Sequence, residues 1–141
     1  MGEPVILDFA EFESIRSEGT ALLIDVRNPG RPFVVRRPMF LQLYLISLKM
    51  VTTITGELQV DGVIPGGVNI PISVVAEAFT TMDPDTFEET FGIGRPGHVD
   101  EIVVFCKIGK RSLSAAKFLK SQGYSNVKSY SGLADWKANQ K

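Results

Sequence analysis

Four short apolar segments stand out along the chain and predict strands. An unbroken apolar run of this length, rich in valine and isoleucine, is typical of a strand that is buried on both faces of a sheet. This pattern is clearest in Ala21–Val26 and in Glu101–Phe105. The other two predicted strands are Val68–Ile70, which Pro71 follows, and Val127–Tyr130.

Segments with helical spacing separate these runs. The first helix is predicted to start at Asp8, a side-chain acceptor that Glu11 follows three residues later, and to end at Gly19. Capping residues and amphipathic spacing predict four further helices: Ser73–Phe79, Asp83–Phe91, Ser112–Gln122 and Leu133–Ala138.

Buried strands that alternate with helices predict one α/β domain. In this class a mostly parallel sheet is flanked by helices on both faces. The 141 residues of the chain are enough for a single domain of ordinary size. Ligands of such sheets bind beyond the carboxyl ends of the strands. Cys106 lies at that edge, because it directly follows the predicted strand Glu101–Phe105.

Composition and charge argue against several classes of protein. The net charge of −1 gives no reason to expect nucleic acid as a partner. One cysteine allows no intramolecular disulfide and no cysteine-based metal cluster, and we expect neither a metal nor a cofactor. The longest apolar stretch, Met39–Thr55, is too short and too polar to predict a membrane span. The single thiol and the absence of a recognisable targeting pattern predict a cytoplasmic location.

The loop between the third predicted strand and its helix carries the candidate chemistry. Gly109 can adopt a positive φ, so that successive N–H groups point inward and bind an anion. The following helix N-terminus and three basic side chains add positive charge. We therefore expect Cys106 to be a nucleophile whose pKa lies well below about 8.5. The residues expected to hold an anionic substrate are Lys107, Ile108, Gly109, Lys110, Arg111 and Ser112.

A structural role for this cysteine is the simplest alternative. A lone cysteine at the end of an apolar strand is more often a small buried hydrophobic residue than a nucleophile. Strand, cysteine, glycine, basic cluster and helix start all fall within a few residues here. That combination favours the nucleophile, although no single part of it does.

Four separated motifs point to a known family. They are Leu23–Arg27, Ile64–Pro71, Cys106–Ser112 and Ser131–Trp136. Together they resemble the single-domain rhodaneses, which are thiosulfate sulfurtransferases with a five-stranded rhodanese-like sheet. Within that family the chain is most similar to the small thiosulfate:glutathione sulfurtransferases, through Met82–Phe87 and Val104–Arg111.

The sequence departs from the family pattern at two positions. Val63 stands where the family usually has a basic residue or histidine, and Ser131 replaces the first of two glycines. Neither departure changes the nucleophile.

The resemblance implies a mechanism. Cys106 would attack the sulfane sulfur of thiosulfate, release sulfite and carry a persulfide. Glutathione, another thiol or cyanide would then remove that sulfur. By the same resemblance Asp25 and Arg27 would support the loop, Asp25 through loop N–H groups or Arg111. A surface Asp–Arg pair worth at most about 1 kcal/mol is the alternative for these two residues.

Three other functions remain to be weighed against this one. A rhodanese-like binding module without activity is the first alternative. A cysteine-dependent phosphatase is disfavoured, because related phosphatase loops place five residues between cysteine and arginine, whereas four separate Cys106 from Arg111. A dithiol oxidoreductase is excluded because the chain has no second cysteine.

Residues 31–56 lie outside the family pattern and read as an insertion in the single domain 1–141. Without them Asn28-Pro29-Gly30 would precede Glu57, which is a good helix start. A connection this long is uncommon in a compact domain. We favour an alternative exon or retained non-coding stretch. A membrane- or partner-binding insertion and an extra hairpin are the other interpretations.

Deletion of residues 31–56 is therefore expected to raise both the melting temperature and the solubility. The segment is apolar, β-prone and basic, which makes it an aggregation hazard when exposed. Thermal unfolding of the parent and the deletion variant measures the effect. A deletion variant that unfolds more easily than the parent would identify the segment as part of the fold.

Overall fold

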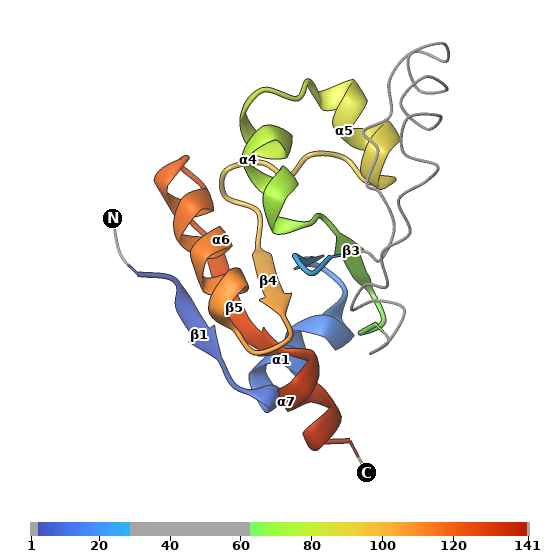
Figure 1. The fold of residues 1–141 in the computed structure, drawn as a ribbon, viewed down its shortest axis with the longest axis vertical. Coiled ribbons are helices and arrows are strands. Elements are labelled where there is room, and N and C mark those ends of the chain that lie inside the picture. Colours follow the sequence, from blue (N-terminus) through green and yellow to red (C-terminus); the bar gives the residue numbers. More distant parts are fainter. Residues whose placement is uncertain (1–2, 29–62, 141) are drawn as a thin grey trace.

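The structure is a computed structural model that describes residues 3–28 and 63–140. Its described strands form one five-stranded sheet in the order β1-β5-β4-β2-β3, and every pairing between them is parallel. Figure 1 shows β4 near the centre of this sheet, as expected from its apolar sequence. The strands are β1 Val5–Leu7, β2 Leu22–Asp25, β3 Gly67–Asn69, β4 Ile102–Cys106 and β5 Val127–Gly132.

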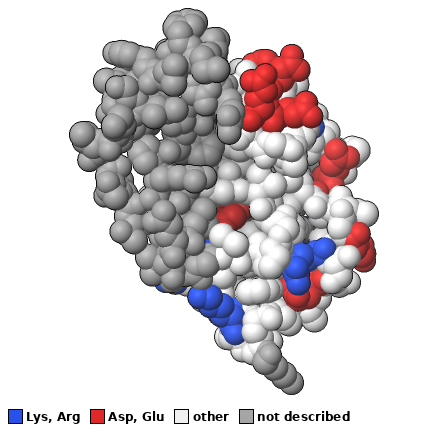
Figure 2. All heavy atoms as spheres, turned by 90° about the vertical axis from the view of Figure 1, so that its right-hand side faces the viewer, with Lys and Arg blue, Asp and Glu red and all other residues white. Residues whose placement is uncertain are grey.

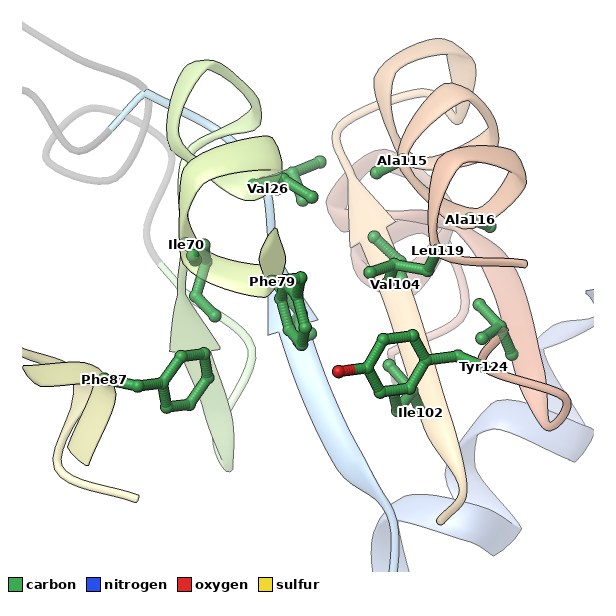
Figure 3. Packing of buried hydrophobic residues seen from close by; sticks show 14 of the residues in the cluster. Val26, Ile70, Phe79, Phe87, Ile102, Val104, Ala115, Ala116, Leu119 and Tyr124 are labelled. Carbon is green, nitrogen blue, oxygen red and sulfur yellow. The ribbon is translucent and has the colours of Figure 1, made fainter. Parts of the chain in front are cut away.

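Helices cover both faces of the sheet and enclose two apolar clusters. The larger cluster lies between the sheet and α4, α5 and α6, and part of it is drawn in Figure 3. The smaller cluster lies between the opposite face and α1 and α7. The helices are α1 Phe9–Glu18, α4 Ile72–Thr80, α5 Pro84–Phe91, α6 Lys110–Ser121 and α7 Leu133–Ala138.

Strand β4 is buried at every position because its side chains contribute to both clusters. Val104 and Cys106 belong to the larger cluster, whereas Val103 and Phe105 belong to the smaller one. This alternation is the reason for an unbroken apolar run in a strand. It also sets the direction of the Cys106 side chain, which lies on the side of the sheet that α6 covers.

The α/β class and the five-stranded parallel sheet are confirmed, as is the presence of the predicted helices and strands within the described residues. The start of α1 is as expected, because the Asp8 carboxylate accepts from the Glu11 N–H at 2.8 Å and the Glu11 carboxylate accepts from the Asp8 N–H. Strand β1 was not predicted. Its three residues, Val5–Leu7, are all apolar, but the strand is short and two of its side chains are exposed at the edge of the sheet.

Several element boundaries differ from the prediction. Helix α4 begins at Ile72 after Pro71, and Ser73 does not cap it. Helix α6 begins at Lys110, inside the predicted loop. Cys106 is the last residue of β4 rather than the residue after the strand. The loop is therefore shorter than the sequence indicated, and the sulfur lies closer to the N-terminus of α6.

The predictions for residues 31–56 lie outside the described residues, so the insertion and the boundaries of the single domain stay predictions. Within the described part of the chain, no helix is both long enough and apolar enough to span a membrane.

Candidate functional site

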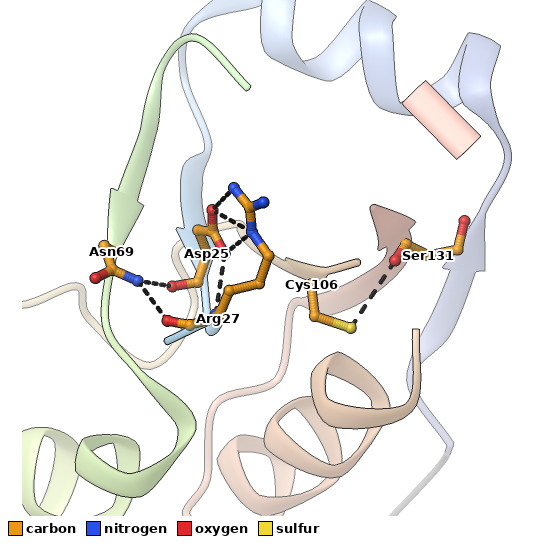
Figure 4. A network of polar contacts seen from close by, with 5 residues as sticks. All are labelled: Asp25, Arg27, Asn69, Cys106 and Ser131. Atoms are coloured by element: carbon orange, nitrogen blue, oxygen red, sulfur yellow. Dashed lines mark hydrogen bonds and ion pairs between the residues drawn. The ribbon is translucent and has the colours of Figure 1, made fainter. Parts of the chain in front are cut away.

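An irregularity in strand pairing places Cys106. The register between β4 and β5 steps from Phe105 opposite Tyr130 to Cys106 opposite Gly132, so Ser131 is an extra residue in β5. Such bulges often re-aim side chains beside active sites. Here the bulge brings the carbonyl oxygen of Ser131 to 3.9 Å from the Cys106 sulfur (Figure 4).

The Cys106 sulfur lies at the N-terminus of α6 and interacts with it directly. Gly109, which precedes the first residue of α6, donates its backbone N–H to the sulfur at 3.0 Å. The Ser112 hydroxyl oxygen lies 3.5 Å from the same sulfur. Gly109 adopts a φ of 102°, which confirms the positive φ expected from the sequence.

These contacts oppose the effect of burial on the thiol. Burial raises the pKa of Cys106, whereas hydrogen bonds from the hydroxyl and the backbone N–H of Ser112 lower that pKa, as do the N–H groups of Gly109 and Ile108. The net result is a pKa below the ordinary value of a cysteine. The sequence predicted this direction. However, the leading causes of the lowering are hydrogen bonds and not the charges of the basic side chains.

The sulfur is less accessible than expected for a nucleophile. Cys106 is 0% exposed. Its neighbours in the loop are at the surface: Lys107 and Lys110 are exposed, and Ile108 is 63% exposed. A small anion can therefore contact the loop side chains, whereas Cys106 itself has no exposed surface.

Asp25 and Arg27 form a buried ion pair beside Cys106. Their side chains are 5% and 0% exposed, and Arg27 Nη2 lies 2.6 Å from Asp25 Oδ2. The carboxylate also accepts from Arg27 Nε and from the Arg27 backbone N–H, each at 3.0 Å. The surface alternative is therefore wrong. The partner expected for Asp25 was also wrong, because its hydrogen bonds go to Arg27 rather than to loop N–H groups or Arg111.

Asn69 on β3 is a further part of this site that the sequence did not identify. Its side-chain amide donates to the carbonyl oxygens of Asp25 at 2.9 Å and of Arg27 at 3.0 Å (Figure 4). It thereby ties the end of β2 to β3. The motif Ile64–Pro71 contains Asn69, but only the strand pairing shows which backbone groups it reaches.

Gly132 is required by close packing against Cys106. A Cβ atom at this position would lie 1.7 Å from the Cys106 carbonyl oxygen, and Gly132 has a φ of 113°. Gly109 is packed against Ser131 in a similar way, with 3.3 Å between its Cβ position and the Ser131 Cα. The two glycines therefore let the strand end, the bulge and the loop approach one another.

The described residues contain no group of three or more histidine, cysteine, aspartate or glutamate side chains that could hold a metal ion. What the arrangement can do chemically is stabilise negative charge on one sulfur through N–H and O–H donors.

Comparison with known proteins identifies the same family as the motifs. The Rhodanese-like domain family matches residues 8–139. A rhodanese domain-containing protein of Drosophila melanogaster is 38% identical over 90 residues, which is 64% of this chain and 77% of the relative.

Two relatives are named thiosulfate:glutathione sulfurtransferase, one from Homo sapiens and one from Saccharomyces cerevisiae. Each is 39% identical, over 50% and 52% of this chain respectively. The matched regions span 62% of the human protein and 52% of the yeast protein. These relatives support an enzyme of the sulfurtransferase type.

A solved structure agrees with the sequence comparisons. The human single-domain sulfurtransferase TSTD1 superposes with a TM-score of 0.67 at 27% identity, and the match covers 100% of both chains. Fold, motifs and family match all lead to one assignment, and the chain belongs to the rhodanese-like domain family.

Proposed function

We propose that this protein transfers a sulfane sulfur from thiosulfate to a thiol through a persulfide on Cys106. The Cys106 thiolate attacks the outer sulfur of thiosulfate, the S–S bond of thiosulfate breaks, and sulfite leaves with the bonding electron pair. An acceptor thiolate, such as glutathione or a protein thiol, then attacks the outer sulfur of the persulfide. The Cys106 thiolate leaves, and the acceptor carries the sulfur away.

The observation that carries this proposal is the donation from the helix start to the sulfur. The Gly109 N–H lies 3.0 Å from it, and the pKa of the thiol is lowered. The same donors would stabilise the negative charge of a terminal persulfide sulfur, because N–H groups at a helix N-terminus favour anions. In this scheme Lys107, Ile108, Lys110 and Arg111 form the surface that first meets thiosulfate, and Asp25 and Arg27 support the strand end.

The distribution of charge fits an anionic donor. Figure 2 shows a group of acidic side chains at the upper end of the face, where α4 and α5 lie, whereas the lower half carries most of the basic side chains together with further acidic ones. Between Ile72 and Gly94 there is no lysine or arginine. The acidic side chains of this region are Glu77, Asp83, Asp85, Glu88 and Glu89. Such a field disfavours approach of an anion at that end and favours approach at the loop.

A non-catalytic binding module is the second candidate, because Cys106 is 0% exposed. In that case the cysteine would be a packing residue of the larger apolar cluster, to which it also belongs. The two candidates differ in a single property, which is whether the folded protein accepts a sulfur atom. A cytoplasmic location also stays a proposal, because one sulfurtransferase relative is named mitochondrial.

Treatment of the protein with thiosulfate is expected to add the mass of one sulfur atom. Because the chain has a single cysteine, the added sulfur can be assigned to Cys106 without mapping. Intact-mass spectrometry of the parent and of Cys106→Ser measures the effect. Dithiothreitol should remove the added mass from the parent, and Cys106→Ser should gain none.

Two controls separate the candidates. Sulfite alone contains no sulfane sulfur and should add nothing. Alkylation of the unfolded protein afterwards reports how much free thiol remained. A folded parent that gains no sulfur, and whose thiol alkylates fully once unfolded, would exclude the enzyme and leave the binding module.

A further inference from the structure

Two buried serine hydroxyls form a series of polar contacts that leads from the Cys106 sulfur into the protein. The buried polar or charged side chains of the described chain are only four: Asp25, Arg27, Ser112 and Ser129. Asp25 and Arg27 form an ion pair with one another. Ser112 and Ser129 are 0% and 2% exposed, and their hydroxyl oxygens lie 3.2 Å apart. Ser112 connects this second pair to the Cys106 sulfur.

Ser129 occupies a position at which an apolar side chain would be expected. It pairs in register with Val104 of β4 and lies two residues after Val127, and both of these belong to the larger apolar cluster. A buried hydroxyl costs free energy unless it is hydrogen-bonded. Within the described residues, the Ser112 hydroxyl is the hydrogen-bond partner of the Ser129 hydroxyl. The hydroxyl of Ser129 therefore interacts with that of Ser112.

The direction of this hydrogen bond follows from the available acceptors. Ser112 has two backbone carbonyls within reach of its proton, Gly109 O at 3.1 Å and Tyr130 O at 3.2 Å, as well as the sulfur. Ser129 reaches the Ser112 oxygen and no further acceptor among the described residues. Donation from Ser129 to Ser112 thus satisfies both protons, whereas the reverse would leave the Ser129 proton buried without an acceptor.

We propose that Ser129 is a positioning residue: its hydroxyl donates to Ser112, so that the Ser112 hydroxyl donates to the Cys106 sulfur when that sulfur is negatively charged. A hydroxyl that accepts a hydrogen bond is a better donor in turn. On ionisation of the thiol, the Ser112 proton turns from a carbonyl to the sulfur without any movement of heavy atoms. The inference deepens the proposed function, since it concerns the same nucleophile.

The substitutions that test this role are Ser129→Val and Ser129→Thr. Valine and threonine have nearly the same shape and both suit a buried strand, so the pair differs in the hydroxyl alone. The Cys106 thiolate is titrated by its ultraviolet absorbance, with the matching Cys106→Ser protein subtracted. This titration needs no reagent to reach the buried sulfur.

The expected result is a graded loss of thiolate. Ser112→Ala should lower the ionisation constant of Cys106 about tenfold, because it removes the direct donor. Ser129→Val should lower that constant about threefold, and Ser129→Thr should leave it close to the parent. Ser114→Ala, an exposed serine of the same helix, is the control for an alanine substitution.

A double variant tests whether Ser129 acts through Ser112. If it does, Ser112→Ala combined with Ser129→Val should match Ser112→Ala alone. Additive effects, or equal ionisation constants for Ser129→Val and Ser129→Thr, would overturn the proposal.

The charged and titratable groups around Cys106 come from β2, the loop, α6, β5 and α7. The substitutions of Ser112 and Ser129 leave all of these groups in place. They are Asp25, Arg27, Lys107, Lys110, Arg111, Tyr130 and Asp135.

The outcome is distinguishable from failure of the proposed function. The titration reports the state of the thiol whether or not the protein transfers sulfur. A parent that gains no sulfur from thiosulfate, but whose titration responds to Ser129→Val and not to Ser129→Thr, would exclude the enzyme and retain the positioning role.

Discussion

Replacement of Asp25 by alanine is expected to destabilise the protein by about 3–5 kcal/mol. The guanidinium of Arg27 is 0% exposed, and its carboxylate partner lies 2.6 Å away. Removal of that carboxylate takes away the negative charge that lies directly against this buried guanidinium. The free energy of unfolding, measured by urea denaturation of the parent and the variant, quantifies the loss.

A second ion pair of the same chain provides the control. Glu13 and Arg16 are 2.7 Å apart, but both side chains are about one-quarter exposed. Arg16→Ala should therefore cost less than about 1 kcal/mol. A double variant with Asp25→Ala and Arg27→Met should recover part of the loss, because no charge is then left buried. If Asp25→Ala cost no more than Arg16→Ala, the pair would not support the strand end.

Gly132→Ala is expected to cost at least about 3 kcal/mol and to prevent sulfur uptake by Cys106. An added Cβ would lie 1.7 Å from the Cys106 carbonyl oxygen and 2.9 Å from its backbone nitrogen. Neither β4 nor the bulge can keep its position around such an atom. Thermal unfolding reports the loss of stability, and the mass gained from thiosulfate reports the loss of the site.

Gly19→Ala separates the effect of contact from that of backbone conformation. Gly19 also has a positive φ, 73°, but a Cβ atom there would meet nothing within 4 Å. Its replacement should therefore cost only about 1 kcal/mol. Equal losses for Gly19→Ala and Gly132→Ala would show that contact with Cys106 contributes nothing.

The candidate site could be predicted in part because its central residues are adjacent in sequence. Cys106, Gly109 and Ser112 fall in one strand–loop–helix segment, so their proximity follows from local structure. Gly109 has the positive φ that the motif requires. Asp25 was placed beside the loop by the family resemblance, and β2 does pair with β4 in register at Asp25 and Phe105.

The remaining parts of the site come from segments far apart in the chain. Asn69 reaches Asp25 across 44 residues, and Ser129 reaches Ser112 across 17. Neither spacing has a local signal, because a hydrogen bond between elements depends on sheet order and register. The partner of Asp25 was missed for a related reason, since the sequence cannot show that Arg27 turns inward.

Residue pattern alone was sufficient for the α/β class, the principal helices and strands and the identity of the candidate nucleophile. Those features depend on periodicity, capping and the order of residues within one segment, all of which act locally. Burial of Cys106, the bulge at Ser131, the inward ion pair and the path from Ser129 to the sulfur emerged from the folded chain. Each depends on which strands become neighbours and on how closely their backbones pack, and such long-range contacts leave no periodic trace in the sequence.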